Sequence, residues 1–179
     1  MKKLILFTVA IFLYLNANCQ TQQSENTEKP FPRFNLGLGG GLDYGGFGLR
    51  GTVVASQRFE IFGALGYNLL GVGFNGGIDL RILPTSRICP YIGAMYGYNA
   101  VIKITGMEEA NQTYYGPTFA LGFEFWSRRK PNFFNLELLI PIRSSEFHSD
   151  YTNIKNNPNI EMKSEIIPVG FAIGYHFTL

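Results

Sequence analysis

The sequence predicts an all-β fold, a closed antiparallel β-barrel of about eight strands that crosses a membrane, preceded by a cleaved signal peptide. From Phe34 to Leu179, short segments alternate bulky apolar residues with small or polar ones, which is the two-residue period of a β-strand. Hydrophobic residues make up 46% of the chain. Beyond the leader, however, no run approaches the roughly 20 apolar residues of a membrane-spanning helix.

The leader, residues 1–19, has the order of a secretion signal. A basic start is followed by an apolar run from Leu4 to Leu15 and by a short polar stretch that ends at Cys19. Cys19 leaves two interpretations open, since a cysteine at this place is either removed with the signal or acylated. Residues 20–33 are polar, contain two prolines and have no periodicity, so we expect a flexible periplasmic lead-in before the barrel domain at 34–179.

The barrel domain divides into eight predicted strands. The alternation is clearest at the C-terminus, where large apolar residues face one side and Gly, Ala, His and Thr face the other. In the first three strands the alternation is weaker, because glycine occurs on both faces. In chain order the predicted strands are Phe34–Tyr44, Phe47–Ser56, Phe59–Leu69, Val72–Ile82, Ile92–Asn99, Tyr115–Phe125, Phe134–Arg143 and Val169–Leu179.

The connections between these strands fall on two sides of the predicted barrel. Turns on one side are expected at 57–58, 84–87 and 127–132, and loops on the other side at 45–46, 70–71, 103–112 and 144–163. The two longest connections share a side. This is the arrangement of an outer-membrane barrel, whose long loops face outward and whose termini lie in the periplasm.

Side-chain size indicates which face lies inside. Eight strands enclose a lumen just wide enough for side chains, so the bulky set should face outward, toward lipid. Aromatic residues near the predicted strand ends fit the girdles of such barrels. A soluble β-sandwich with the same aromatics in its core remains the alternative. The aromatics are Tyr44, Phe59, Tyr67, Tyr98, Tyr114, Tyr115, Phe125 and Trp126.

Charged residues recur on the small face, where burial requires that they be paired or solvated. We expect them to form a lumenal salt-bridge network that plugs the barrel. A narrow polar pore lined by the same residues is the alternative. The predicted network consists of Asp43, Arg50, Glu60, Asp79, Arg81, Glu124, Glu137, Arg143 and His176.

Composition narrows the classes of function. The chain has 15 basic and 13 acidic residues, and two lysines lie in the leader, so the mature chain is neutral and no nucleic-acid partner is expected. Cys89 is the one cysteine beyond the leader, and a single thiol forms neither an internal disulfide nor a redox or metal motif. No nucleotide or phosphate-binding fingerprint occurs, so we expect no cofactor and no metal.

The C-terminal segment Gly174-Tyr175-His176-Phe177-Thr178-Leu179 resembles the insertion signal of outer-membrane barrels, with Gly174, Phe177 and Leu179 as its elements. Together with the leader and the strand pattern, it makes residues 34–179 resemble the small outer-membrane β-barrel family of the OmpA/OmpX type. The resemblance implies a Gram-negative outer membrane, with its lipids and the barrel-assembly machinery as partners. It implies little about activity.

For function we expect a structural or surface-interaction barrel without catalysis, whose loops 103–112 and 144–163 contact an external partner. The first alternative is a narrow porin or a transporter of small solutes or lipids. The second is a lipid-modifying enzyme. For this, Glu146, His148, Ser149 and Asp150 supply the residue types of acyl transfer, although a polar surface loop explains them equally well.

Overall fold

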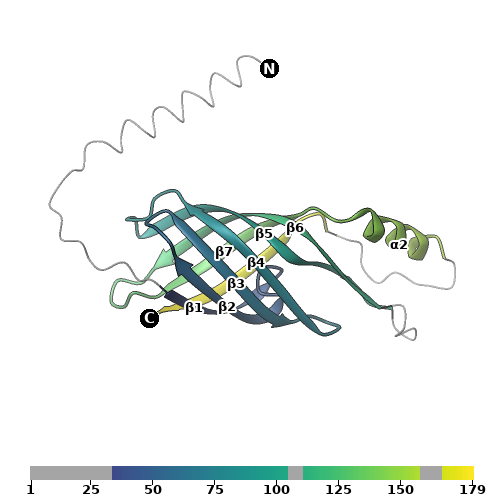
Figure 1. Ribbon diagram of the computed structural model, residues 1–179, viewed down its shortest axis with the longest axis horizontal. Helices are drawn as coiled ribbons and strands as arrows, with labels where there is room; N and C mark the ends of the chain where they lie inside the picture. The colour runs from purple at the N-terminus through teal and green to yellow at the C-terminus, as the bar shows by residue number, and fades with distance from the viewer. Residues whose placement is uncertain (1–33, 105–110, 158–166) are drawn as a thin grey trace, which may run out of the picture. The chain divides into compact units, whose positions relative to one another are not determined.

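Eight antiparallel strands form one closed barrel in the order β1 to β8 (Figure 1), in a computed structural model that describes residues 34–104, 111–157 and 167–179. The predicted signal peptide, Cys19 and the lead-in at 20–33 lie outside the described residues, as do the middle of loop 103–112 and the end of loop 144–163. Closure is made by β1 and β8, where Leu36 lies opposite Phe177. Every strand therefore has two neighbours, and the barrel has no free edge.

The predicted strands agree with the observed ones in number and order, and differ at their ends. Most have eight to ten residues, whereas β5 and β6 each have 15. A helix, α2, lies between the last two strands. The elements are β1 (Phe34–Gly41), β2 (Gly46–Val54), β3 (Phe59–Tyr67), β4 (Val72–Arg81), β5 (Ile88–Ile102), β6 (Gln112–Trp126), β7 (Phe133–Pro141), α2 (Ser145–Lys155) and β8 (Gly170–Thr178).

The outer wall of the barrel is apolar and the interior is polar. Along β8, Phe171 is 68% exposed while its neighbour Ala172 is 2% exposed. The same alternation runs through the other strands, because successive side chains point to opposite faces. The predicted assignment of the two faces is confirmed for most positions, since most bulky apolar side chains face outward. Phe62, Met95 and Leu139 are exceptions, because they are buried inside the barrel with Tyr44.

The two ends of the barrel differ in structure. At one end, here the turn end, residues 55–58, 82–87 and 127–132 join neighbouring strands. At the other, the loop end, β5 and β6 continue until Ile102 lies opposite Gln112. Helix α2 also lies at the loop end, opposite the C-terminus (Figure 1).

The regular alternation of β5 is lost near Gly97, where φ is 154°, and a register shift against β6 falls between Tyr98 and Ala100. Tyr98, Asn99 and Ala100 are all buried. Tyr98 lies opposite Tyr115, ahead of the shift, so the pairing leaves it on the predicted face, although its side chain is buried and not exposed. The two-residue period is interrupted after Tyr98, at Asn99.

The turn between β1 and β2 folds into the barrel. It is closed by a hydrogen bond from Gly45 N to Leu42 O of 3.0 Å, and Gly45 and Gly46 have φ angles of 70° and 111° that favour glycine. The side-chain amide of Asn75 donates to the Leu42 carbonyl from the lumen. Tyr44 is fully buried as a result, so its predicted place in an aromatic girdle is wrong.

Helix α2 occupies a segment predicted as an irregular loop. Ser144 caps its N-terminus by accepting from Phe147 N at 3.2 Å, and Lys155 lies in its last turn. Phe147, Tyr151 and Ile154 recur at helical spacing. Phe147 is buried against Tyr114 of β6, with ring centroids 5.1 Å apart. Within the described part of the chain, no helix is long and apolar enough to cross a membrane.

Candidate functional site

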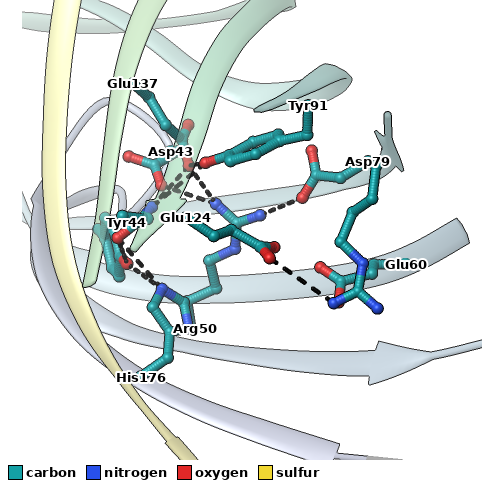
Figure 2. A network of polar contacts seen from close by, with 11 residues as sticks. Asp43, Tyr44, Arg50, Glu60, Asp79, Tyr91, Glu124, Glu137 and His176 are labelled. Atoms are coloured by element: carbon teal, nitrogen blue, oxygen red, sulfur yellow. Dashed lines mark hydrogen bonds and ion pairs between the residues drawn. The ribbon is translucent and has the colours of Figure 1, made fainter. Parts of the chain in front are cut away.

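The lumen is organised around Arg50 of β2, which is 3% exposed. Its Nη1 donates to Asp43 Oδ2 in the β1–β2 turn and to Glu137 Oε1 on β7, both at 2.9 Å. Its Nη2 donates to Asp79 on β4. Figure 2 shows the guanidinium among these carboxylates. The Arg50 side chain therefore links its own strand, β2, to β4 and to β7, neither of which is a neighbour of β2 in the sheet.

A second cluster surrounds Arg81 of β4. Its Nη1 lies 3.1 Å from Glu60 Oε1 on β3 and 3.6 Å from Glu124 Oε2 on β6, while its Nη2 donates to the Gln57 carbonyl at 3.0 Å. The indole nitrogen of Trp126 donates to Glu124 at 2.9 Å. Because Gln57 and Trp126 lie at the turn end, this cluster lies at that end of the lumen.

A hydrogen-bonded group of neutral and weakly basic side chains extends the Arg50 cluster. Tyr44 Oη donates to Asn135 Oδ1 at 3.1 Å and lies 2.7 Å from His176 Nε2. Asn135 Nδ2 in turn donates to Glu137 Oε1 at 2.7 Å, and Tyr91 donates to the same oxygen. Strands β5, β7 and β8 and the β1–β2 turn are thus connected through polar contacts (Figure 2).

Glycines on the small face make room for these large lumenal side chains. A methyl group at Gly174 or Gly39 would collide with the Tyr44 ring, and one at Gly122 would collide with Tyr91. Gly37 likewise lies against the His176 ring. These glycines therefore leave space inside the barrel for large aromatic side chains.

The lumen holds more acidic than basic groups. Within the described residues, two guanidiniums, of Arg50 and Arg81, contact the carboxylates through the ion pairs above. No described group of three or more His, Cys, Asp or Glu is arranged to hold a metal ion. An excess of three carboxylates gives the interior a negative formal charge. The five buried carboxylates belong to Asp43, Glu60, Asp79, Glu124 and Glu137.

Eight of the nine residues predicted for the lumenal network are brought together by the structure, and Arg143 is not. Strand β7 ends at Pro141, so Arg143 lies at the loop end. There its Nη2 donates to Ile167 O at 2.7 Å and its guanidinium lies 5.3 Å from the Phe147 ring centroid. Partial burial lowers the pKa of Arg143. The prediction that Arg143 belongs to the network is wrong, because β7 ends two residues before it, at Pro141.

The predicted network lacks three residues that bond within the Arg50 cluster, Tyr44, Tyr91 and Asn135. The alternation of the strands indicates the lumenal position of Tyr91 and Asn135, because residues two apart on a strand share a face. Tyr91 shares its face with Gly93, and Asn135 shares its face with Glu137. Tyr44 has no such signal, because it lies in a turn. Of the predicted insertion signal, Gly174 faces Tyr44 in the lumen, whereas Phe177 and Leu179 are exposed on the outer wall.

The residue types of acyl transfer are not assembled into a triad in the described structure. His176 is buried, bonded to Tyr44 and stacked on Phe133 with ring centroids 4.4 Å apart. His148 is exposed on α2. The carboxylates beside it bond elsewhere: Asp150 accepts from Tyr114 at 2.7 Å and Glu146 from Gln112 at 3.2 Å.

Comparison with known proteins supplies no family for this chain. No protein-family model matches it, and no curated protein matches it. The function is therefore inferred from the distribution of residues over the barrel and from the geometry of its lumen.

Proposed function

We propose that the chain is the precursor of an integral outer-membrane β-barrel protein of a Gram-negative bacterium, with a plugged lumen and a structural or surface-interaction role. The observation that supports it is the inverted distribution of side chains. Leu121 and Phe123 of β6 are half exposed on the wall, while Glu124 is 2% exposed inside. A soluble barrel places its apolar face inside, whereas lipid surrounds a membrane barrel and favours this inversion.

Backbone closure and strand length support the same proposal. Hydrocarbon offers no hydrogen-bonding partner, so a spanning sheet must satisfy every strand edge, as the pairing of β1 with β8 does. Strands of about nine to eleven residues cross a bilayer at a tilt. Strands β2, β3, β7 and β8 have nine residues each and β4 has ten.

The position of the long connections supports an orientation. Outer-membrane barrels carry short turns on the periplasmic side and longer loops outside. The loop end of this barrel carries the extended β5–β6 hairpin and α2, so we place it outside the cell and the turn end in the periplasm. The leader at 1–19 would direct export, and the barrel-assembly machinery would then insert the chain, with Gly174, Phe177 and Leu179 as its C-terminal signal.

The contacts in the lumen favour a plug. Arg50 reaches from β2 to β4 and β7 within the closed barrel, and Arg81 pairs with Glu60 and Glu124 at the turn end. The three-carboxylate excess supports a second candidate function, a narrow cation-selective pore. Conductance in a planar bilayer distinguishes the two: the plug predicts no channel steps, and the pore predicts steps that favour cations over anions.

The loop end offers a surface for an external partner. Phe147 and Tyr114 fix α2 on the β5–β6 hairpin, and the Tyr114–Asp150 and Gln112–Glu146 hydrogen bonds add polar links. The exposed residues of α2 are polar: Ser145, Glu146, His148, Ser149, Thr152, Asn153 and Lys155. A helix held in this way presents a fixed surface, which supports the surface-interaction role over a purely structural one.

Cysteine labelling tests the proposed location and orientation together. Asn153 is exposed on α2, and Ser86 is exposed at the turn end. In intact cells we expect a membrane-impermeant maleimide to label Asn153→Cys and not Ser86→Cys, with native Cys89 silent because it is buried. Fractionation should recover both variants in the outer membrane. Recovery in the soluble periplasm would overturn the proposal, and labelling of Ser86→Cys alone would reverse the orientation.

A further inference from the structure

A groove on the outer wall at the turn end combines an apolar floor with a polar rim. Its floor is a row of outward side chains on four adjacent strands: Ile88 on β5, Phe125 on β6, Phe134 on β7 and Tyr175 on β8, each opposite the next. The hollow has a volume of about 390 Å³. In the orientation proposed above, this row faces the acyl chains of the periplasmic leaflet.

The rim of the groove carries a cationic group. Arg87 is exposed beside Trp126, and its Nε donates to the Trp126 carbonyl at 3.3 Å. This bond uses one of the five donors of the guanidinium, and its terminal nitrogens bond to no other described residue. The bond to the Trp126 carbonyl therefore holds the Arg87 guanidinium beside the apolar floor and leaves its terminal N–H groups available to a ligand.

The charge of the turn end supports an anionic occupant. Arg58, Arg87 and the turn residues Arg128, Arg129 and Lys130 are all exposed there. Among the described residues, the acidic side chains at this end, Glu60 and Glu124, are buried with Arg81. An anion therefore meets attraction at the rim of the groove.

We propose that this groove binds a phospholipid with a net negative headgroup, whose phosphate is held by Arg87 and whose acyl chain lies on the row from Ile88 to Tyr175. A guanidinium is suited to this role because it presents paired donors to phosphate oxygens. The turn from Arg128 to Lys130 adds attraction without a fixed contact. This inference rests on the proposed function, since a soluble barrel would meet no bilayer.

The indole of Trp126, the one tryptophan of the chain, bonds to Glu124 inside the barrel, so the reporter of the groove is Ile88→Trp in a Trp126→Phe background, since Ile88 lies on the groove floor. The full chain is reconstituted in vesicles of phosphatidylcholine with one-fifth phosphatidylglycerol, and either lipid carries brominated acyl chains that quench tryptophan. Quenching by each lipid, at matched mole fractions, gives the relative affinity at the site. We expect phosphatidylglycerol to be preferred about five-fold, the effect of one basic residue near a charged lipid surface.

The variant Arg87→Gln should lose this preference, while the matched control Arg58→Gln, at the turn end but away from the groove, should keep it. Equal quenching by both lipids without the Arg87 substitution would contradict the proposal that the groove selects an anionic lipid. So would an unchanged preference in Arg87→Gln, or an equal loss in Arg58→Gln, since the latter indicates diffuse surface charge. Absence of quenching by either lipid would instead overturn the membrane barrel itself, which separates the two failures.

Discussion

Arg50 is the residue on which the lumenal network depends most, because its guanidinium is shared by Asp43, Asp79 and Glu137. A buried ion pair is weak evidence for stability, since desolvation offsets its attraction. Removing one partner is different. The charges left behind are then buried without compensation, and the cost is large.

We therefore predict that Arg50→Met destabilises the barrel by about 3–5 kcal/mol. The free energy of unfolding is measured by urea titration in detergent micelles, with Trp126 fluorescence as the signal. Arg58→Gln, which removes an exposed arginine at the turn end, is the control and should change stability by less than about 0.5 kcal/mol. An Arg50→Met variant as stable as this control would show that the network does not hold the strands together.

The close approach of Gly174 to Tyr44 gives a second residue-scale prediction. Gly174→Ala places a methyl group against the Tyr44 hydroxyl and ring, and overpacking of this kind costs about 1–3 kcal/mol. In a Tyr44→Phe background the hydroxyl is absent, so the cost of Gly174→Ala should fall. A double-mutant cycle on unfolding free energies measures this coupling. Equal costs in the two backgrounds would contradict the contact.

The alternation of side chains along each strand predicts which residues face the lumen, and it fails at particular residues. Glu137 and Asp79 could be placed in the lumen because each alternates with bulky neighbours on a regular strand. Arg143 was wrongly placed there, although Pro141, which has no backbone N–H to donate to the sheet, marks the end of β7. Tyr44 was also misplaced, since its direction depends on the φ angles of Gly45 and Gly46 and on a tertiary contact from Asn75.

Helix α2 is the element that the strand pattern did not predict. Its apolar residues cover two turns only, and most helical stability in proteins comes from packing rather than propensity. Here that packing is a contact with the end of a hairpin that itself extends beyond its predicted length. The β5–β6 extension and the helix stabilise each other through Tyr114 and Phe147. The sequence of either segment by itself therefore does not predict its structure.

We predict that Phe147→Ala releases α2 without unfolding the barrel. Phe147 is the one buried residue of the helix, whereas the strands make their contacts elsewhere. The rate of tryptic cleavage after Lys155 should rise at least ten-fold in detergent micelles, with the urea midpoint of the barrel unchanged. Asn153→Ala, on the exposed face of α2, should leave the cleavage rate as it was. Loss of the whole barrel in Phe147→Ala would show that α2 is part of the core.

For the whole molecule, the outward apolar wall has a consequence that a soluble protein would not share. Leu121 lies in the middle of the outer wall, between Ile92 and Leu138 on the neighbouring strands. In a bilayer, Leu121→Arg should cost about 2–4 kcal/mol, and Leu69→Arg, at the loop end, at most about 1 kcal/mol. Urea unfolding from lipid vesicles measures both. Equal, small costs would indicate that water, not lipid, surrounds the wall.

The sequence as a whole predicts the closed order of the strands. Eight consecutive segments of similar length, joined mostly by short connections, favour pairing of each strand with the next one along the chain. The inside and the outside followed from side-chain volume against the width of an eight-stranded lumen. The exact contacts within the lumen did not follow. They depend on which opposite side chains meet across the barrel, as Arg50 meets Glu137, and register between distant strands is not a local property of the sequence.

Electrophoresis of the membrane-extracted protein, with and without boiling, tests the central claim most directly. A closed barrel with every strand paired resists unfolding by detergent until it is heated. We expect the unheated protein to migrate as a compact species and the boiled protein at the position of the unfolded chain, with the unheated species recovered from the outer-membrane fraction. Identical mobility before and after boiling, from a mature chain that remains in the aqueous phase, would contradict the account.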